Sequence, residues 1–140
     1  MIRPFETDDL DRVMNIWLAA NTSAHDFIEA GYWQSHFEEV RQLLPQSDVY
    51  IFEEDGEIQG FIGLTGDHIA GLFVAPGKQS RGIGKALLDH VKKDRSTLFL
   101  KVYQKNIRAI YFYVREGFRI IREDMDESSW EAEYRLTWSR

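Results

Sequence analysis

Residues 79–85, with the sequence QSRGIGK, have types and spacing that suit an anion site. They follow a short strand-like apolar run, Leu72, Phe73 and Val74, and they open a stretch whose apolar residues recur at helical intervals. The first N–H groups of a helix lack intrahelical partners and lie at the positive end of its dipole, so they attract an anion. Two glycines leave these amides accessible, and two basic side chains add charge. The sequence therefore predicts a phosphate-binding glycine loop made of Gln79, Ser80, Arg81, Gly82, Ile83, Gly84 and Lys85.

Three well-known motifs do not fit this segment. A P-loop requires Lys and then Ser or Thr where the chain has Ile83 and Gly84, and a dinucleotide fingerprint requires a third glycine in place of Leu87. The nucleophile elbow of hydrolases requires glycine two residues before the serine, but Lys78 stands two residues before Ser80. A turn that only begins a helix is the simpler alternative, since short glycine motifs often match by chance.

A second candidate cluster lies at residues 106–118, NIRAIYFYVREGF. Asn106 and Tyr113 are seven residues apart, which is two helical turns, so their side chains project from one face about 10 Å apart along the axis. An extended ligand could contact both. Two alternatives need no ligand: Tyr113 would fill the core with its apolar neighbours, and Asn106 would only cap the helix.

Taken together, the two clusters resemble a known family. The patterns Q-x-x-G-x-G and N-x-x-A-x-x-F-Y-x-x-x-G-F, in this order and about 20 residues apart, are similar to the acyl-CoA sites of the GNAT N-acetyltransferase superfamily. The resemblance covers residues 69–118 closely and the flanking segments only by their order. It implies acetyl-CoA as cosubstrate, an amine as acceptor, and direct transfer of the acetyl group from the thioester to that amine.

The resemblance also implies roles for individual residues. The coenzyme A diphosphate would bind the glycine loop, and the pantetheine arm would pair with exposed backbone of the strand Leu72, Phe73 and Val74. Asn106 matches the family's cofactor-contacting asparagine. Tyr113 matches the tyrosine that protonates the departing thiolate, and it is the one catalytic residue that we assign from the sequence.

The sequence offers several candidates for the group that deprotonates the acceptor. An alkylammonium with a pKa near ~10.4 is mostly protonated at neutral pH, so a base or a water chain must take its proton. Many GNAT relatives have glutamate five residues before the asparagine, where this chain has Lys101. That departure leaves His25, His68, Glu53 or water. The four histidines have no metal-ligand spacing, so we expect no metal site.

The elements that position these residues can be read from hydrophobic periodicity and turn signals. We expect a first helix, capped by Thr7 or Asp8, that buries Leu10, Val13, Ile16, Trp17 and Ala20 and ends near Asn21. Further helices are predicted at 32–44, 85–91 and 107–116. Strands are predicted at 1–5, 49–52, 58–64, 69–74, 98–102, 118–123 and 132–138, with a hairpin at Asp55-Gly56.

This order predicts an α/β (α+β) fold. The strand-helix-strand unit at 69–102 requires a parallel crossover, whereas the hairpins require antiparallel pairing. The arrangement is GNAT-like, with a mixed, mostly antiparallel sheet of six or seven strands and helices on both faces. A chain of 140 residues with 44% hydrophobic content is expected to form a single domain, 1–140.

Charge and composition limit the partners. Residues 1–60 contain 3 basic and 13 acidic residues, whereas residues 61–120 contain 11 basic and 4 acidic residues. An anionic cofactor would be attracted to the basic part, while the acidic remainder disfavours nucleic acid. The chain has no cysteine, no signal-like apolar start and no membrane-length apolar run, so we expect a cytoplasmic protein without membrane contact, as a monomer or homodimer.

Several acceptors and two other classes of protein stay open at this point. The acidic N-terminal part, with Asp26, Glu29, Tyr32 and Trp33, suits a cationic amine. A protein lysine, a protein N-terminus, a polyamine and an aminoglycoside all meet that description. A non-catalytic acyl-CoA sensor would keep the glycine loop without a base, and a nucleotide-binding protein would use the loop without acyl chemistry.

Overall fold

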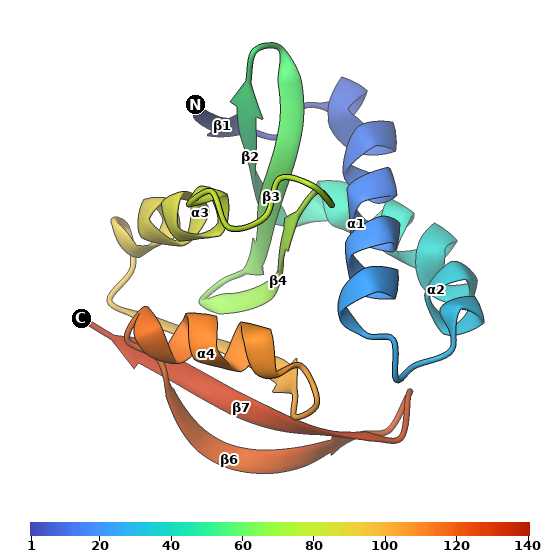
Figure 1. Ribbon diagram of the computed structural model, residues 1–140. Coiled ribbons are helices and arrows are strands. Elements are labelled where there is room, and N and C mark those ends of the chain that lie inside the picture. The colour runs from blue at the N-terminus through green and yellow to red at the C-terminus, as the bar shows by residue number, and fades with distance from the viewer.

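A computed structural model describes residues 1–140 as one mixed sheet of seven strands, in the order β1-β2-β3-β4-β5-β7-β6, with four α-helices (Figure 1). The strands are β1 (Ile2–Pro4), β2 (Asp48–Glu54), β3 (Glu57–Thr65), β4 (His68–Val74), β5 (Thr97–Tyr103), β6 (Arg119–Asp126) and β7 (Glu131–Ser139). The helices are α1 (Leu10–Ala24), α2 (Ala30–Leu43), α3 (Ile83–Lys92) and α4 (Ile107–Arg115). All neighbouring strands are antiparallel except β4 and β5.

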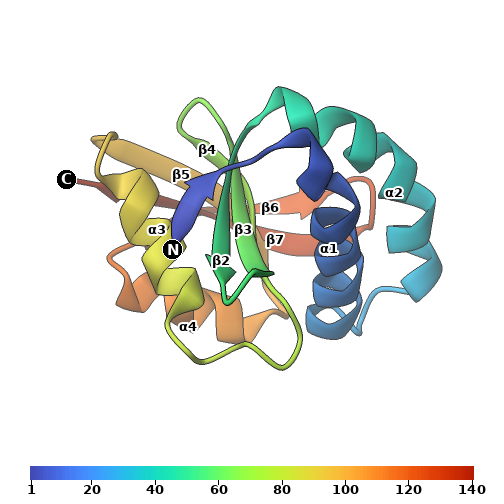
Figure 2. The ribbon, with the colours of Figure 1, turned by 90° about the horizontal axis from the view of Figure 1, so that it is seen from above.

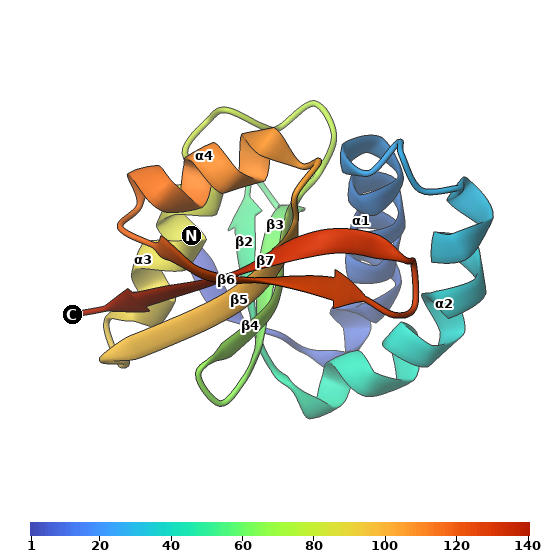
Figure 3. The ribbon, with the colours of Figure 1, turned by 90° about the horizontal axis from the view of Figure 1, so that it is seen from below.

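Helices cover both faces of the sheet and bury two apolar clusters. α1 and α2 lie on one side, whereas α3 and α4 lie on the other (Figures 2 and 3). The first cluster joins α3 and α4 to β3, β4, β5 and β7, and the second joins α1 and α2 to β2 and β3. The α/β fold class predicted from the order of elements is thereby confirmed, with seven strands. None of the helices is long and apolar enough to cross a membrane.

The predicted hairpin between β2 and β3 forms at Asp55 and Gly56, where φ is +55° and +75°. Two consecutive positive φ values are typical of the turn whose twist matches paired strands. Several helix boundaries differ from those expected. The first helix continues past Asn21 to Ala24, because the Asn21 side chain turns back and donates to the Trp17 carbonyl, at 2.9 Å, instead of breaking the helix.

The start of the first helix also differs from the prediction. Residues Thr7–Asp9 form a 3-10 turn that is capped by Glu6, and the Asp9 carboxylate accepts from the Glu6 backbone N–H at 2.8 Å. Arg3 from β1 holds that carboxylate with two further hydrogen bonds. The second helix begins two residues before the predicted start, and Leu44 belongs to a 3-10 turn that contains Pro45.

The feature that opens the site is the divergence of β4 from β5. These two strands are parallel and joined by the α3 crossover, yet only His68 and Phe99 pair in register. On its other side, β4 pairs with β3 up to Val74, with a bulge between Ile69 and Gly71. Beyond Ile69, the edge of β4 that faces β5 therefore has no strand partner, and its backbone groups are available to another molecule.

Candidate functional site

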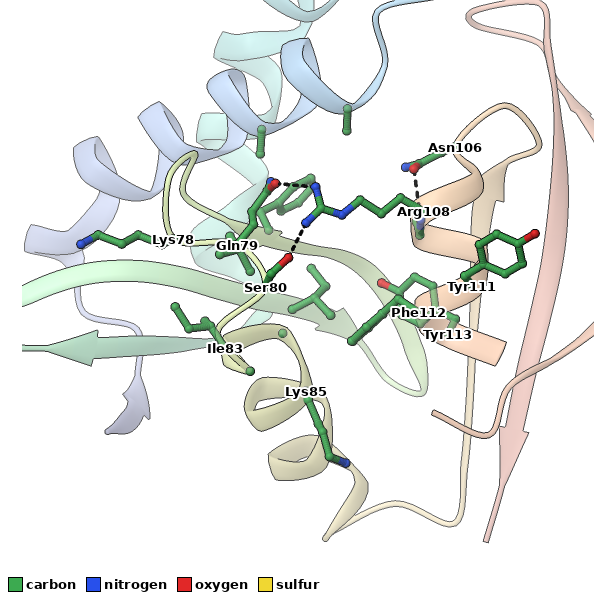
Figure 4. Close-up of a pocket in the computed structure, with 18 of the residues that line it drawn as sticks. Lys78, Gln79, Ser80, Ile83, Lys85, Asn106, Arg108, Tyr111, Phe112 and Tyr113 are labelled. Carbon is green, nitrogen blue, oxygen red and sulfur yellow. Dashed lines mark hydrogen bonds between the residues drawn. The ribbon is translucent and has the colours of Figure 1, made fainter. Parts of the chain in front are cut away.

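A cavity of about 580 Å³ lies beside this edge, with walls from α1, β4, α4 and the segment that leads into α3 (Figure 4). Most of the residues selected from the sequence line it. They are Leu72, Phe73, Val74, Gln79, Ser80, Gly82, Ile83, Gly84, Lys85, Asn106 and Tyr113. Within the glycine loop, Arg81 is the one residue that does not line the cavity, and it is exposed.

The glycine loop presents a row of unpaired backbone amides. None of the N–H groups of residues 79–85 donates a hydrogen bond within the chain, and the first helical bond runs from the Ala86 N–H to the Gly82 carbonyl at 3.0 Å. Gly82 is the N-cap of α3, with φ of +82°, a conformation that favours glycine. The loop therefore offers donors and the positive end of a helix to an anion.

Four basic side chains line the cavity, and they differ in how their charges are compensated. The Lys85 ammonium lies 3.1 Å from Asp89 and 3.0 Å from Glu116, and the Arg115 guanidinium lies 3.4 Å from the same Glu116 carboxylate. Lys78 and Arg108 have no carboxylate partner. Lys85 therefore brings its predicted positive charge to the loop, but two acidic side chains pair with it.

Arg108 is a cavity residue that the sequence analysis missed. It lies at the start of α4, and its guanidinium donates to the Gln79 Oε1 atom at 2.9 Å and to the Ser80 Oγ atom at 2.8 Å (Figure 4). The sequence offered one indication of its role, since Arg108 is a basic residue within the second cluster, 106–118. Its partners, however, are 28 and 29 residues away in the chain.

Asn106 caps α4 from within the cavity wall. Its Oδ1 atom accepts from the Ala109 N–H at 3.2 Å, and its Nδ2 atom lies 3.1 Å from the Nε2 atom of His25. The helix-capping alternative is therefore realised in the structure, and one amide N–H and a second lone pair are left for a ligand.

His25 follows the last residue of α1 and is held in an aromatic cluster. Its ring stacks on Trp33 with centroids 5.2 Å apart and meets the edges of Phe27 and Tyr103. Burial lowers the pKa of the His25 imidazole to about 4, so the ring is neutral at physiological pH. A neutral ring can accept the Asn106 N–H only through an unprotonated Nε2, which places the proton on Nδ1.

Tyr113 serves the core and the cavity at once. Its ring packs against Phe112 and Phe118, with centroids 5.1 and 5.4 Å away, and only 8% of the residue is exposed. Its hydroxyl makes no hydrogen bond within the chain, although the residue lines the cavity. Burial raises the pKa of this hydroxyl well above its usual value, so it keeps its proton at neutral pH and has that proton to donate.

Comparison with known proteins identifies the family. The model of the acetyltransferase (GNAT) domain matches residues 45–120. The chain is 39% identical to the peptidyl-lysine N-acetyltransferase YiaC of Escherichia coli, over 99% of this chain and 93% of that protein. This protein belongs to the GNAT acetyltransferase family. It is also 30% identical to the peptidyl-lysine N-acetyltransferase YjaB of Salmonella typhimurium, over 90% of this chain and 88% of that protein.

Solved structures agree with this GNAT assignment. The solution structure of apo-form YjaB from Escherichia coli has a TM-score of 0.87 at 26% sequence identity, and it covers 99% of this chain and 96% of that chain. The resemblance inferred from the two motifs is thereby confirmed. As a GNAT acetyltransferase, this protein is an enzyme that transfers an acetyl group to an amine.

The base candidates of this GNAT chain lie in different places. Glu53 is on β2, where it pairs with Arg3, and His68 is at the start of β4 beside Phe99, so neither lines the cavity. Lys101 lies outside the cavity as well and faces the Glu133 carboxylate at 3.9 Å. Only His25 lines the cavity, but its Nε2 lone pair is already directed at Asn106.

Proposed function

We propose that this enzyme uses acetyl-CoA to acetylate the ε-amine of lysine in proteins or peptides. The row of unpaired amides at residues 79–85, opening into the cavity, is the observation that carries the cofactor assignment. The similarity over nearly the whole chain to two peptidyl-lysine N-acetyltransferases supports the acceptor assignment. Acetyl-CoA would supply the acetyl thioester.

The residues around the cavity have distinct tasks in this proposal. The amides of the glycine loop bind the diphosphate. The unpaired backbone edge of β4 at Leu72, Phe73 and Val74 forms hydrogen bonds with the amide groups of the pantetheine arm. These contacts fix an extended ligand along the cavity. Tyr113 then lies on the same wall as Asn106, with a protonated hydroxyl free to donate to the leaving thiolate.

The cavity supplies no obvious base for the acceptor. We infer that the lysine loses its proton to water or solvent before it attacks, because the one titratable imidazole in the cavity is committed to Asn106. The same arrangement predicts that acetylation becomes faster as the pH rises toward the pKa of the lysine ammonium.

A panel of acceptors tests this function. The enzyme is incubated with acetyl-CoA and one of three acceptors: a peptide with one lysine and a blocked N-terminus, its arginine-substituted twin with a free N-terminus, or spermidine. Released thiol and the peptide mass are measured. We expect release of CoA and one added acetyl group only with the lysine peptide. Faster turnover with spermidine or with the free N-terminus would identify that amine, and not lysine, as the acceptor. If no amine leads to release of CoA, the acceptor assignment is refuted.

A further inference from the structure

The Arg108 side chain extends from α4 to the glycine loop. Its Nη1 atom donates to Gln79 at 2.9 Å and its Nη2 atom donates to Ser80 at 2.8 Å, so both arms of the guanidinium are engaged (Figure 4). All three residues line the cavity. A ligand that reaches the glycine loop therefore meets this bridge.

Both acceptors of the bridge are uncharged. A side-chain amide oxygen and a hydroxyl hold the guanidinium, and no carboxylate lies within ion-pair distance of it. The neighbouring cations Lys85 and Arg115 both pair with Glu116. Arg108 thus carries an uncompensated positive charge, unlike the other two. Lys78 is also without a carboxylate partner, but it extends away from the bridge in Figure 4.

The bridge ends at the first two residues of the row of unpaired amides. Ser80 has a φ of +64°, which is uncommon for a residue with a side chain, and the N–H groups from Gln79 to Lys85 all lack partners. An anion bound to these amides would lie beside the guanidinium. Arginine binds two phosphate oxygens at once, and such charge-assisted bonds are roughly twice as strong as bonds to neutral acceptors.

We propose that Arg108 is an exchangeable phosphate ligand. Before the cofactor binds, Gln79 and Ser80 hold the guanidinium beside the glycine loop. When the coenzyme A diphosphate reaches the glycine loop, its oxygens replace these two side chains as acceptors. Gln79 and Ser80 then act through Arg108 as positioning residues, and only their backbone amides bind phosphate. This inference rests on the proposed function, because it takes coenzyme A as the ligand.

The first experiment compares two arginine variants. Arg108→Gln removes the bridge, while Arg119→Gln makes the same charge change at an exposed β6 residue without side-chain hydrogen bonds or ion pairs. Calorimetry measures the dissociation constants of CoA and of pantetheine, which has no phosphate. We expect Arg108→Gln to weaken CoA roughly 10- to 100-fold, as for other charged hydrogen bonds, and to leave pantetheine unchanged. Arg119→Gln should alter neither.

CoA carries both a diphosphate and a 3′-phosphate, and 3′-dephospho-CoA shows which of the two Arg108 binds. If Arg108 binds the diphosphate, Arg108→Gln weakens this ligand by the same factor as CoA. Loss of the effect with dephospho-CoA would assign Arg108 to the 3′-phosphate and overturn the proposal. An equal loss of pantetheine affinity in Arg108→Gln would indicate a structural defect and overturn the proposal. An equal loss of CoA affinity in Arg119→Gln would indicate a long-range electrostatic effect and would also overturn it.

A second experiment tests the exchange itself. The double variant Gln79→Ala, Ser80→Ala releases Arg108 and keeps the backbone amides. If the two side chains only hold the guanidinium, CoA binds with equal or higher affinity than in the wild type, whereas a loss as large as that of Arg108→Gln would overturn the exchange. Failure of wild-type enzyme to bind acetyl-CoA would instead refute the proposed function, so the two ideas fail separately.

Discussion

The Nε2 atom of His25 lies 3.1 Å from the Nδ2 atom of Asn106, and this contact joins the end of α1 to the first turn of α4. The two elements come from opposite faces of the sheet and meet at the cavity. Because Nε2 must be unprotonated to accept, the contact exists only while His25 is neutral.

We expect the free energy of unfolding to fall between pH 6.5 and pH 4. The folded-state pKa of His25 is about 4, below the unfolded value of about 6.5, so the unfolded chain binds more protons in this window. The contribution is fully present above the unfolded pKa and is lost as the pH falls. For this one group the loss at pH 5 is roughly 1 to 2 kcal/mol.

Urea unfolding at pH 7.5 and pH 5 measures this loss. His25→Gln keeps an acceptor but cannot titrate, so the difference between the two pH values should shrink relative to the wild type. His90→Gln, on α3, is the matched control because its ring lies outside the cavity. An unchanged pH dependence in His25→Gln would contradict the assigned burial and tautomer of His25.

Tyr113→Phe should lower kcat by about 100-fold, at the lower end of the range for general acid catalysis, because a thiolate is a fairly good leaving group. The dissociation constant of acetyl-CoA and the melting temperature should change little, since the ring packing is retained. Steady-state kinetics, calorimetry and a thermal melt measure the three quantities. Tyr134→Phe, in the same apolar cluster but outside the cavity, provides the comparison. A kcat within about twofold of wild type would leave Tyr113 a purely structural role.

Gly84→Asp should weaken acetyl-CoA binding at least about tenfold, because it places a negative charge beside the amides that receive the diphosphate. The fold should tolerate it: a Cβ atom at Gly84 would lie 3.5 Å from the Phe112 ring, an ordinary contact, and an acidic side chain in the first turn favours a helix. Gly84→Ala separates the charge from the added volume. Calorimetry measures the dissociation constant of acetyl-CoA for both variants. If Gly84→Asp binds acetyl-CoA as tightly as the wild type, the glycine loop does not bind the diphosphate.

The value of kcat/KM for a lysine peptide should rise with pH from 6.5 to 9. Below the ammonium pKa of about 10.4, each pH unit increases the fraction of free amine about tenfold. Initial rates at constant ionic strength give the profile. A plateau in kcat/KM that begins below pH 8 would show that a group on the enzyme takes the proton, and would contradict deprotonation by water.

The parts of the site that could be predicted from the sequence are those built from local rules. The glycine loop and the spacing of Asn106 and Tyr113 follow from helix geometry and from residue types adjacent in the chain. Lys85 is different. Its pairing with Glu116, 31 residues away, depends on how α3 packs beside α4, and no local pattern encodes that distance.

The same limit applies to the fold. The hairpin at Asp55 and Gly56 and the helical periodicities were readable, because each depends on a few neighbouring residues. The end of α1 was not, since Asn21 can either interrupt a helix or turn its side chain back to the preceding turn. The roles of His25 and Arg108 depend on partners 81 and up to 29 residues away, which only the folded chain brings together.

The divergence of β4 from β5 also divides the sheet into two halves that are weakly connected by backbone hydrogen bonds. β1–β4 and β5–β7 share one register pair, so few backbone hydrogen bonds transmit cooperativity from one half to the other. We expect the halves to exchange their amide hydrogens as separate units in the free protein. A ligand that bonds to β4 and also contacts α4 would connect the two halves. Amide exchange in both halves would then slow together, because the bound ligand stabilises the folded state of both.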